Sequence, residues 1–191
     1  MVFQLLLCLI FHRPYTLNVM NIFRVLAQDA KRYDRQLSIR FLLRLLVQSP
    51  GFSAVILIRV MQAVQVIRVP FVSMLVTFRI RRILISNFGI DVGPNCKIGP
   101  GLKIDHPVGI VIGGGVVIGE CATILSGCVI GEKYIDKRST GAYPILGNHV
   151  TVGCGSIILG GIILGDKVNI GAGSIVIKSV PGNSHVAGLI K

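Results

Sequence analysis

A repeat of six residues in the second half of the chain is the feature that most constrains its fold. From position 89 onwards an aliphatic residue recurs every sixth position, and in nine of thirteen cases a glycine follows it directly. A six-residue period fits neither an α-helix nor a β-hairpin, and such self-similarity is typical of solenoids. The thirteen aliphatic positions are Val92, Ile98, Ile104, Ile112, Ile118, Ile124, Ile130, Leu146, Val152, Ile158, Leu164, Ile170 and Val176.

The position four residues after each aliphatic residue supports this interpretation, because it too is small or apolar almost throughout. One inward aliphatic residue per short strand, with glycine at the corner, predicts stacked turns that bury a continuous aliphatic column. The sequence therefore predicts a parallel β-helix. The second inward positions are Cys96, Leu102, Val108, Val116, Ala122, Cys128, Val150, Ser156, Ile162, Val168, Ser174 and Val180.

The chain divides into four parts. Residues 1–19 are expected to be a non-essential extension with Met20 as the natural start. Residues 20–88 predict a helical head, residues 89–180 the β-helix, and residues 181–191 a C-terminal tail. Within the head we expect helices over 21–33, from Ser38 to a break at Pro50-Gly51, over 52–67 and over 70–88.

The composition is 52% hydrophobic, yet no apolar run reaches the ~20 residues that a membrane-spanning helix requires. The apolar start of the chain lacks the basic region and the cleavage site of a signal peptide, so none is expected. Five cysteines without a C-x-x-C pair argue against a disulfide framework. We expect them to be reduced, buried hydrophobes in a cytoplasmic protein.

The net charge of +12 is concentrated in the first half of the chain, where residues 1–82 carry +10. A basic, apolar head could contact the inner face of a membrane or bind a phosphate-bearing ligand. The alternative is an ordinary solvated surface of amphipathic helices. No nucleic-acid partner is expected.

The six-residue period breaks twice, and departures from period in a solenoid indicate functional sites. The first break runs from Ile104 to Ile112, eight residues instead of six, and contains His106. The second runs from Ile130 to Leu146, sixteen residues where we expect twelve, through a charged excursion.

The segments FGIDVGP at position 88 and IGPGLKIDHPVGIVIG at position 98 resemble the active-site region of serine acetyltransferases. PGFSA at position 50 and IGAGSIVIKSVP at position 170 resemble two further segments of that family. The resemblance covers about residues 20–188 and is closest to the short-headed, colanic acid-type branch of surface-polysaccharide O-acetyltransferases. It implies a left-handed parallel β-helix with coils of eighteen residues.

The resemblance also implies a catalytic dyad. His106 would be the general base that takes a proton from the acceptor hydroxyl, and Asp91 would hold its imidazole. Asp105 would face the acceptor. A neutral alcohol is a poor nucleophile, and a positioned general base contributes roughly 10²–10⁴ in rate.

Acetyl-CoA, by the same resemblance, would lie between adjacent subunits of a homotrimer, and no metal is expected. Lys178 has the clearest physical reason for a role, since a cation favours phosphate. The residues expected along pantetheine, adenosine and phosphates are Gly131, Cys154, Gly155, Ala172, Ser174 and Lys178.

The chain departs from the serine-specific pattern at two places. The aspartate that those enzymes carry in the helical head, before the segment similar to PGFSA, has no in-register counterpart, because Asp34 is close but offset. Those enzymes carry an Arg-His pair just before the repeats resume, where this chain has Ala142 and Tyr143. Tyr143 is therefore expected at the acceptor, and a sugar hydroxyl in polysaccharide synthesis is favoured over serine. Serine O-acetylation in cysteine biosynthesis remains the first alternative.

Two other classes of function stay open. Some β-helix trimers are zinc enzymes, and the histidines available for such a site are His106, His149 and His185. Three converging histidines are needed, and none of these lies close to another in sequence. A non-catalytic scaffold or a membrane-associated binding module is the remaining alternative.

Overall fold

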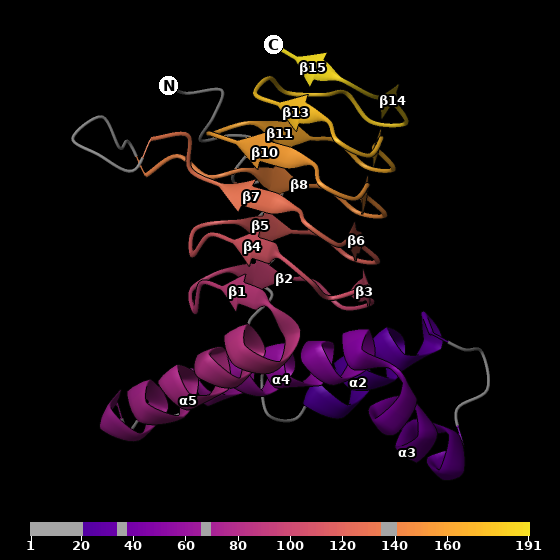
Figure 1. Cartoon of the computed structure of the whole chain (residues 1–191), viewed down its shortest axis with the longest axis vertical. Helices are drawn as coiled ribbons and strands as arrows, with labels where there is room; N and C mark the ends of the chain where they lie inside the picture. The colour runs from indigo at the N-terminus through magenta and orange to yellow at the C-terminus, as the bar shows by residue number, and fades with distance from the viewer. Residues whose placement is uncertain (1–20, 34–37, 66–69, 135–140) are drawn as a thin grey trace.

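The computed structural model describes residues 21–33, 38–65, 70–134 and 141–191. Within these ranges, a head of four helices forms one end of the molecule, and a solenoid of short strands rises from it to the C-terminus (Figure 1). The expected extension at 1–19 lies outside the described residues. The helices are α2 (Ile22–Lys31), α3 (Ile39–Gln48), α4 (Pro50–Val64) and α5 (Pro70–Phe88).

The predicted break between the second and third helices is present, but it lies at Ser49, and Pro50 and Gly51 already belong to the first turn of α4. Proline is suited to the first helical turn, and the Ser49 hydroxyl caps this helix by accepting from the Phe52 amide at 3.3 Å. Gly51 is required because a side chain there would collide with the carbonyl of Ile104 in the first coil. The motif thus seats the head on the solenoid.

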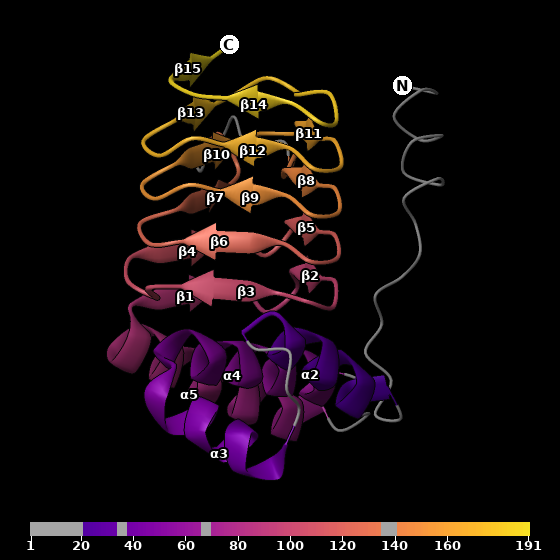
Figure 2. The ribbon, with the colours of Figure 1, turned by 90° about the vertical axis from the view of Figure 1, so that its right-hand side faces the viewer.

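The strands form three parallel sheets that make the three faces of a prism (Figure 2). Sheet A contains β1 (Ile90–Val92), β4 (Ile110–Ile112), β7 (Val129–Gly131), β10 (Ile157–Leu159), β13 (Ile175–Val176) and β15 (Leu189–Ile190). Sheet B contains β2 (Lys97–Ile98), β5 (Val117–Ile118), β8 (Ile145–Leu146) and β11 (Ile163–Leu164). Sheet C contains β3 (Lys103–Asp105), β6 (Thr123–Leu125), β9 (Thr151–Val152), β12 (Asn169–Ile170) and β14 (His185–Val186). The chain passes from A to B to C in every complete coil, so the prism has an A–B, a B–C and a C–A edge.

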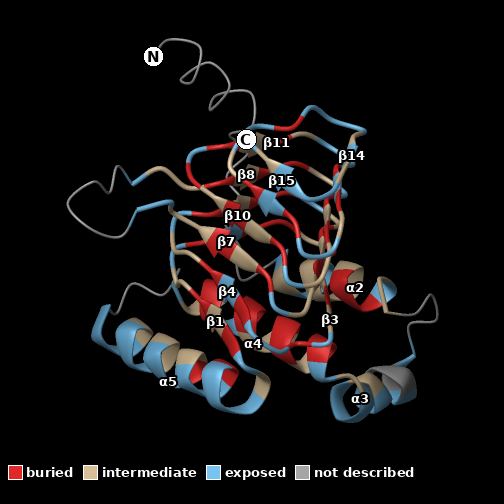
Figure 3. Cartoon of the chain, turned by 45° about the horizontal axis from the view of Figure 1, so that its top comes forward, coloured by how far each residue is buried: buried red, intermediate tan, exposed pale blue. Residues whose placement is uncertain are grey.

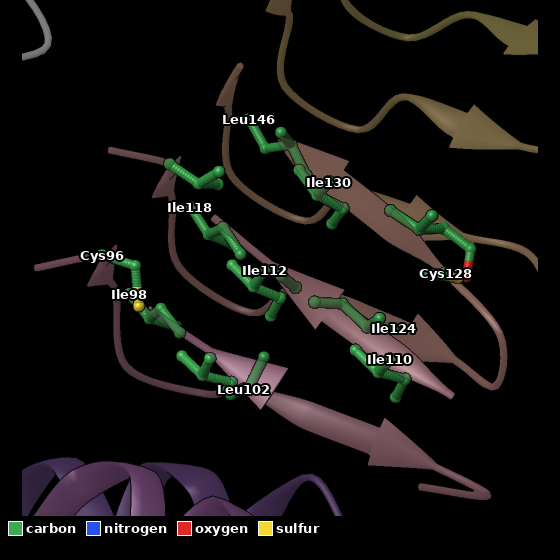
Figure 4. Packing of buried hydrophobic residues seen from close by; sticks show 14 of the residues in the cluster. Cys96, Ile98, Leu102, Ile110, Ile112, Ile118, Ile124, Cys128, Ile130 and Leu146 are labelled. Atoms are coloured by element: carbon green, nitrogen blue, oxygen red, sulfur yellow. Dashed lines mark hydrogen bonds between the residues drawn. The ribbon is translucent and has the colours of Figure 1, made fainter. Parts of the chain in front are cut away.

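The predicted aliphatic column fills the prism. All thirteen repeat positions are buried, and their side chains stack from coil to coil (Figure 4). The second inward positions are buried as well, except Val108, which is 67% exposed. The two additional residues of the first break turn Val108 outward, and Pro107 is buried in that corner instead.

The register of the ladders gives the size of each break. Ile112 pairs with Ile130, which is a regular coil of three six-residue steps, whereas the coil from Val92 to its partner Ile112 contains the two additional residues of the first break. Ile118 pairs directly with Leu146 in the next coil. The interval from Ile130 to Leu146 therefore replaces one six-residue step, not the two that we expected, and the excursion is larger than the sequence indicated.

The coil also continues beyond residue 180, where the sequence placed its end. Ile170 pairs with Val186 and Val176 with Ile190, so both of these coils are shorter than three six-residue steps. Shortened coils do not match a six-residue period, so the periodicity could not predict them.

A buried network joins the head to the first coil. Arg59 of α4 and Asp29 of α2 form a fully buried ion pair with a 2.8 Å bond. Arg59 also donates to the carbonyls of Ile98 and Gly99 at 2.7 and 2.6 Å, and Asp29 accepts from the Leu102 amide at 2.8 Å. The two charges compensate each other where neither could be buried alone.

The cysteines differ from the expectation in part. Cys96 and Cys128 are buried, but Cys121 and Cys154 lie at corners and are partly exposed. Cys8 lies outside the described residues. Among the helices that the structure describes, none is long and apolar enough to cross a bilayer.

Candidate active site

His106 lies at the C–A edge, directly after β3. Its side chain is exposed, and its backbone has a φ of 54°, which residues other than glycine adopt uncommonly. The following residues Pro107 to Gly109 carry the chain across the edge into β4. The imidazole is thus presented to solvent at a corner whose left-handed backbone recurs at Cys121, His149, Lys167 and Asn183, so this conformation belongs to the coil and does not by itself mark a site.

Asp91 lies in the middle of β1 with its carboxylate held by Arg81 of α5. The guanidinium donates to both oxygens, at 2.6 and 2.9 Å, and the two side chains are 42% and 37% exposed. These bonds raise the pKa of Arg81. No hydrogen bond between Asp91 and His106 is present among the described residues, so the two members of the predicted dyad are not bonded to each other in this chain.

Asp105 immediately precedes His106 and is half-buried on sheet C. Its carboxylate forms a 3.0 Å ion pair with Lys103, two residues earlier on the same face of β3. Lys103 in turn lies 5.9 Å from the ring centroid of Tyr33 in the head. The acidic side chain expected at the acceptor is therefore next to the candidate base and already paired with a cation.

Three of the residues predicted at the cofactor lie in one row above His106. The Gly127 amide donates to Val108, Gly155 to Ser126 and Gly173 to Cys154, at 2.7 to 2.8 Å, which stacks successive C–A corners on one another. Cys154, Gly155 and Ala172 consequently line the same edge as His106, and all three are at least partly exposed.

The remaining predicted residues do not join this row. Gly131 ends β7, and Lys178 follows β13, so both lie toward the A–B edge. Ser174 points inward: its hydroxyl is buried, donates to the Gly171 carbonyl at 2.6 Å and accepts from the Gly188 amide at 3.2 Å. The hydroxyl of Ser174 is occupied within the coil.

Tyr143 also lies at the A–B edge, where the excursion returns to the coil. Its ring packs across Gly113 and Gly115, at which any side chain would collide with it. This contact explains Gly113 and Gly115, whereas a side chain at Gly114 would not meet Tyr143. Within one chain, Tyr143 and His106 are on different edges of the prism.

Known proteins that are similar to this chain in sequence point to one family. No family model matches the sequence. A serine acetyltransferase of Helicobacter pylori is 38% identical over 141 residues, which are 73% of this chain and 78% of that protein. The chain belongs to the serine acetyltransferase family. A serine acetyltransferase of Synechococcus elongatus is 34% identical over 87% of this chain, and the chain spans 66% of that relative's length, just under two thirds.

Solved structures of serine acetyltransferases share the fold. The enzyme of Neisseria gonorrhoeae in complex with serine superposes with a TM-score of 0.74 at 29% identity, over 88% of this chain and 67% of that one. A serine acetyltransferase in complex with CoA gives 0.73 at 28% identity, with the same coverage. The left-handed parallel β-helix with a small helical head is therefore the architecture of this family member.

The resemblance to the family did not indicate Arg81 as a partner of Asp91, nor did it say where in the fold the three histidines would lie. Arg81 was missed because it belongs to no motif, and only the packing of α5 on β1 brings it to Asp91. His149 lies at the B–C edge and His185 in β14, so the structure spreads the three histidines over different places. The described residues contain no group of three or more His, Cys, Asp or Glu side chains that could hold a metal ion.

Proposed function

We propose that this protein is an acetyl-CoA-dependent O-acetyltransferase in which His106 is the general base. The observation that carries the proposal is the row along the C–A edge, where an exposed imidazole lies on the same edge as Cys154, Gly155 and Ala172. Membership of the family supports it, and one of the similar structures was solved with CoA.

In the proposed reaction, the imidazole of His106 removes the proton of the acceptor hydroxyl. The oxygen attacks the thioester carbonyl carbon, the C–S bond breaks, and the thiolate of CoA takes up the proton from the imidazolium. Asp91 would orient the imidazole in the assembled enzyme, with Arg81 fixing the carboxylate. Positioned proton transfer of this kind contributes roughly 10²–10⁴ in rate.

Serine is the acceptor that the relatives support, by their names and by the structure solved with serine. The comparisons give no support to the sugar acceptor expected from the sequence. A sugar hydroxyl remains the second candidate because of one observation: Ala142 and Tyr143 stand where serine-specific enzymes carry a cationic pair. Tyr143 offers no charge to the carboxylate of serine.

The test is an acceptor screen with acetyl-CoA in which free thiol is detected. We expect thiol release that depends on serine and is lost in a His106→Asn variant. Release that depends on a sugar, with serine inert, would move the assignment to the second candidate. Absence of release with every acceptor would support a non-catalytic scaffold and contradict the proposal.

A further inference from the structure

Lys103 and Asp105 form a pair of opposite charges beside the candidate base. Both lie on the outward side of β3, with the buried Ile104 between them, and their charged atoms are 3.0 Å apart. Asp105 directly precedes His106, so the pair borders the place where the acceptor hydroxyl must lie. An ammonium group has three donors and a carboxylate has several acceptor positions, so neither group is saturated by the other. The pair is therefore suited to a ligand that carries both charges.

The helical head fixes Lys103 in this place. Figure 3 shows β3 next to α2 and α4 of the head, and the hydroxyl of Tyr33, just after α2, bonds the amide and the carbonyl of Ile104 at 2.9 and 3.1 Å. The ring of Tyr33 packs edge-on against Phe52 of α4 and lies 5.9 Å from the ammonium of Lys103, within the range of a cation–π contact. Burial raises the pKa of Tyr33, so its ring stays uncharged and does not neutralise Lys103.

Arg32 adds a second cation to the same face of sheet C. It directly follows α2, and its Nη2 atom donates to the hydroxyl of Thr123 in β6 at 2.7 Å. Thr123 is the ladder partner of Lys103 in the next coil, so both cations lie on one face. The Nε atom of Arg32 is buried and has no hydrogen-bond partner among the described residues. Two cations thus accompany the carboxylate of Asp105, which favours a ligand that brings a further negative charge.

We propose that Lys103 binds the carboxylate of an α-amino acid acceptor while Asp105 binds its ammonium group. The inference rests on the proposed function and deepens it, because it names the class of acceptor and the residue that selects it. Ala142 and Tyr143 provide no cation for such a carboxylate, and Lys103 provides one from a different element. If Lys103 only neutralised Asp105, its removal would instead improve the binding of acceptors that carry an ammonium group.

The experiment measures thiol release from acetyl-CoA with three acceptors that differ in charge. L-Serine carries both charges, glycerate has a hydroxyl in place of the ammonium, and ethanolamine lacks the carboxylate. We expect Lys103→Met to raise the KM for serine roughly 10- to 100-fold, because a hydrogen bond between charged groups is lost. The KM values for ethanolamine and for acetyl-CoA should not change. Lys103→Arg keeps the cation and should retain most of the activity with serine.

Asp105→Asn gives the reciprocal test, since it should weaken serine and ethanolamine but not glycerate. The matched control is Lys97→Met, which removes an exposed lysine from β2 in the same coil, on sheet B, and should behave as the wild type does. Circular dichroism checks that each variant is folded.

An unchanged or lower KM for serine in Lys103→Met would overturn the inference and leave the acetyltransferase assignment intact. Thiol release that depends on a sugar, with serine, glycerate and ethanolamine all inert, would overturn it in the same way. Absence of release with every acceptor would contradict the inference and the proposed function together.

Discussion

The left-handed backbone at His106 has a counterpart at His149, and the pair offers a controlled test of the base. Both are exposed corner residues with positive φ, 54° and 58°. Asparagine tolerates this conformation better than most residues, so it removes the imidazole without adding backbone strain. Substitution at either position therefore has a similar structural effect, and only the chemistry differs.

We expect His106→Asn to lower kcat by roughly 10²–10⁴ and to leave the affinity for acetyl-CoA nearly unchanged, because the imidazole acts on the acceptor's proton. His149→Asn should retain wild-type kcat. Steady-state kinetics and a direct CoA-binding measurement check both. A His106→Asn enzyme with full turnover would remove the general base from the mechanism.

Asp91 gives the second test at this scale. If it orients the imidazole, Asp91→Asn should lower kcat no more than His106→Asn does, and the double variant should be no worse than the His106 variant alone. Its unfolding free energy should fall by at most about 1 kcal/mol, since the pair with Arg81 is partly exposed. Additive kinetic losses would show that Asp91 acts independently of His106.

The sequence could indicate His106 because the residue interrupts a period, and it could not indicate Arg81 because nothing local marks it. The hydrogen bonds to Asp91 arise only where α5 packs on β1. For the same reason the placement of Tyr143 was not foreseen, since the length of an excursion does not say to which edge of the prism it returns.

At the scale of elements, the regular part of the fold was predictable and its ends were not. Thirteen buried aliphatic positions follow from periodicity alone. The seating of the head required packing information: Gly51 fits against the Ile104 carbonyl of the first coil, a contact that the sequence alone does not reveal. The last coils, which end at Val186 and Ile190, are shorter than the regular ones, and no repeat analysis could anticipate this.

The junction between α2, α4 and the first coil depends on the buried pair of Asp29 and Arg59. Removing one partner of such a pair leaves an uncompensated buried charge and costs about 3–5 kcal/mol. We expect Asp29→Asn to lower the free energy of unfolding by this amount in urea denaturation. Asp91→Asn is the matched control, because it also neutralises an aspartate paired with arginine, but at a partly exposed site. Equal losses in the two variants would contradict the role of burial.

The buried thiol of Cys96, at the first corner of the solenoid, predicts that stability depends on pH in the alkaline range. Burial raises the pKa of the Cys96 thiol to about 12, from an ordinary value near 9. The folded state thus favours the neutral thiol. The contribution of Cys96 to the free energy of unfolding is therefore complete below about pH 9 and is lost as pH rises from there toward about 12.

Thermal unfolding between pH 8 and pH 11 tests this dependence. Wild-type stability should decline above about pH 9 more steeply than that of Cys96→Ala, which has no thiol to ionise. The two proteins are compared by how steeply their stability falls with pH, and not by its absolute value, since the alanine variant is also less well packed at every pH. Parallel curves for the two proteins would rule out Cys96 as the cause.

At the scale of the whole molecule, the residues expected at one site are divided between two edges of the prism. His106, Cys154 and Ala172 lie along the C–A edge, whereas Tyr143 and Lys178 lie toward the A–B edge. A single chain cannot bring the two edges together. Neighbouring copies can, if the C–A edge of one faces the A–B edge of the next, and a closed ring satisfies this for every copy.

We therefore expect a homotrimer in sedimentation at micromolar concentration. Activity should appear when a His106→Asn chain is mixed under reassembly conditions with a chain substituted at Lys178. Some interfaces between the two kinds of chain would then contain an intact His106 from one chain and an intact Lys178 from the other. A fully active monomer would contradict this arrangement, as would mixed assemblies without recovered activity.

A solenoid also has two open ends, and the end at the first coil is covered here by the helical head. Arg59 donates to carbonyls of Ile98 and Gly99, and the Tyr33 hydroxyl bonds both the amide and the carbonyl of Ile104. Without the head, the first coil would expose unpaired backbone N–H and C=O groups of its strands. Another chain could add to these groups, and end-to-end growth into fibres would follow. The same contacts that seat the helices therefore act as a terminator of polymerisation.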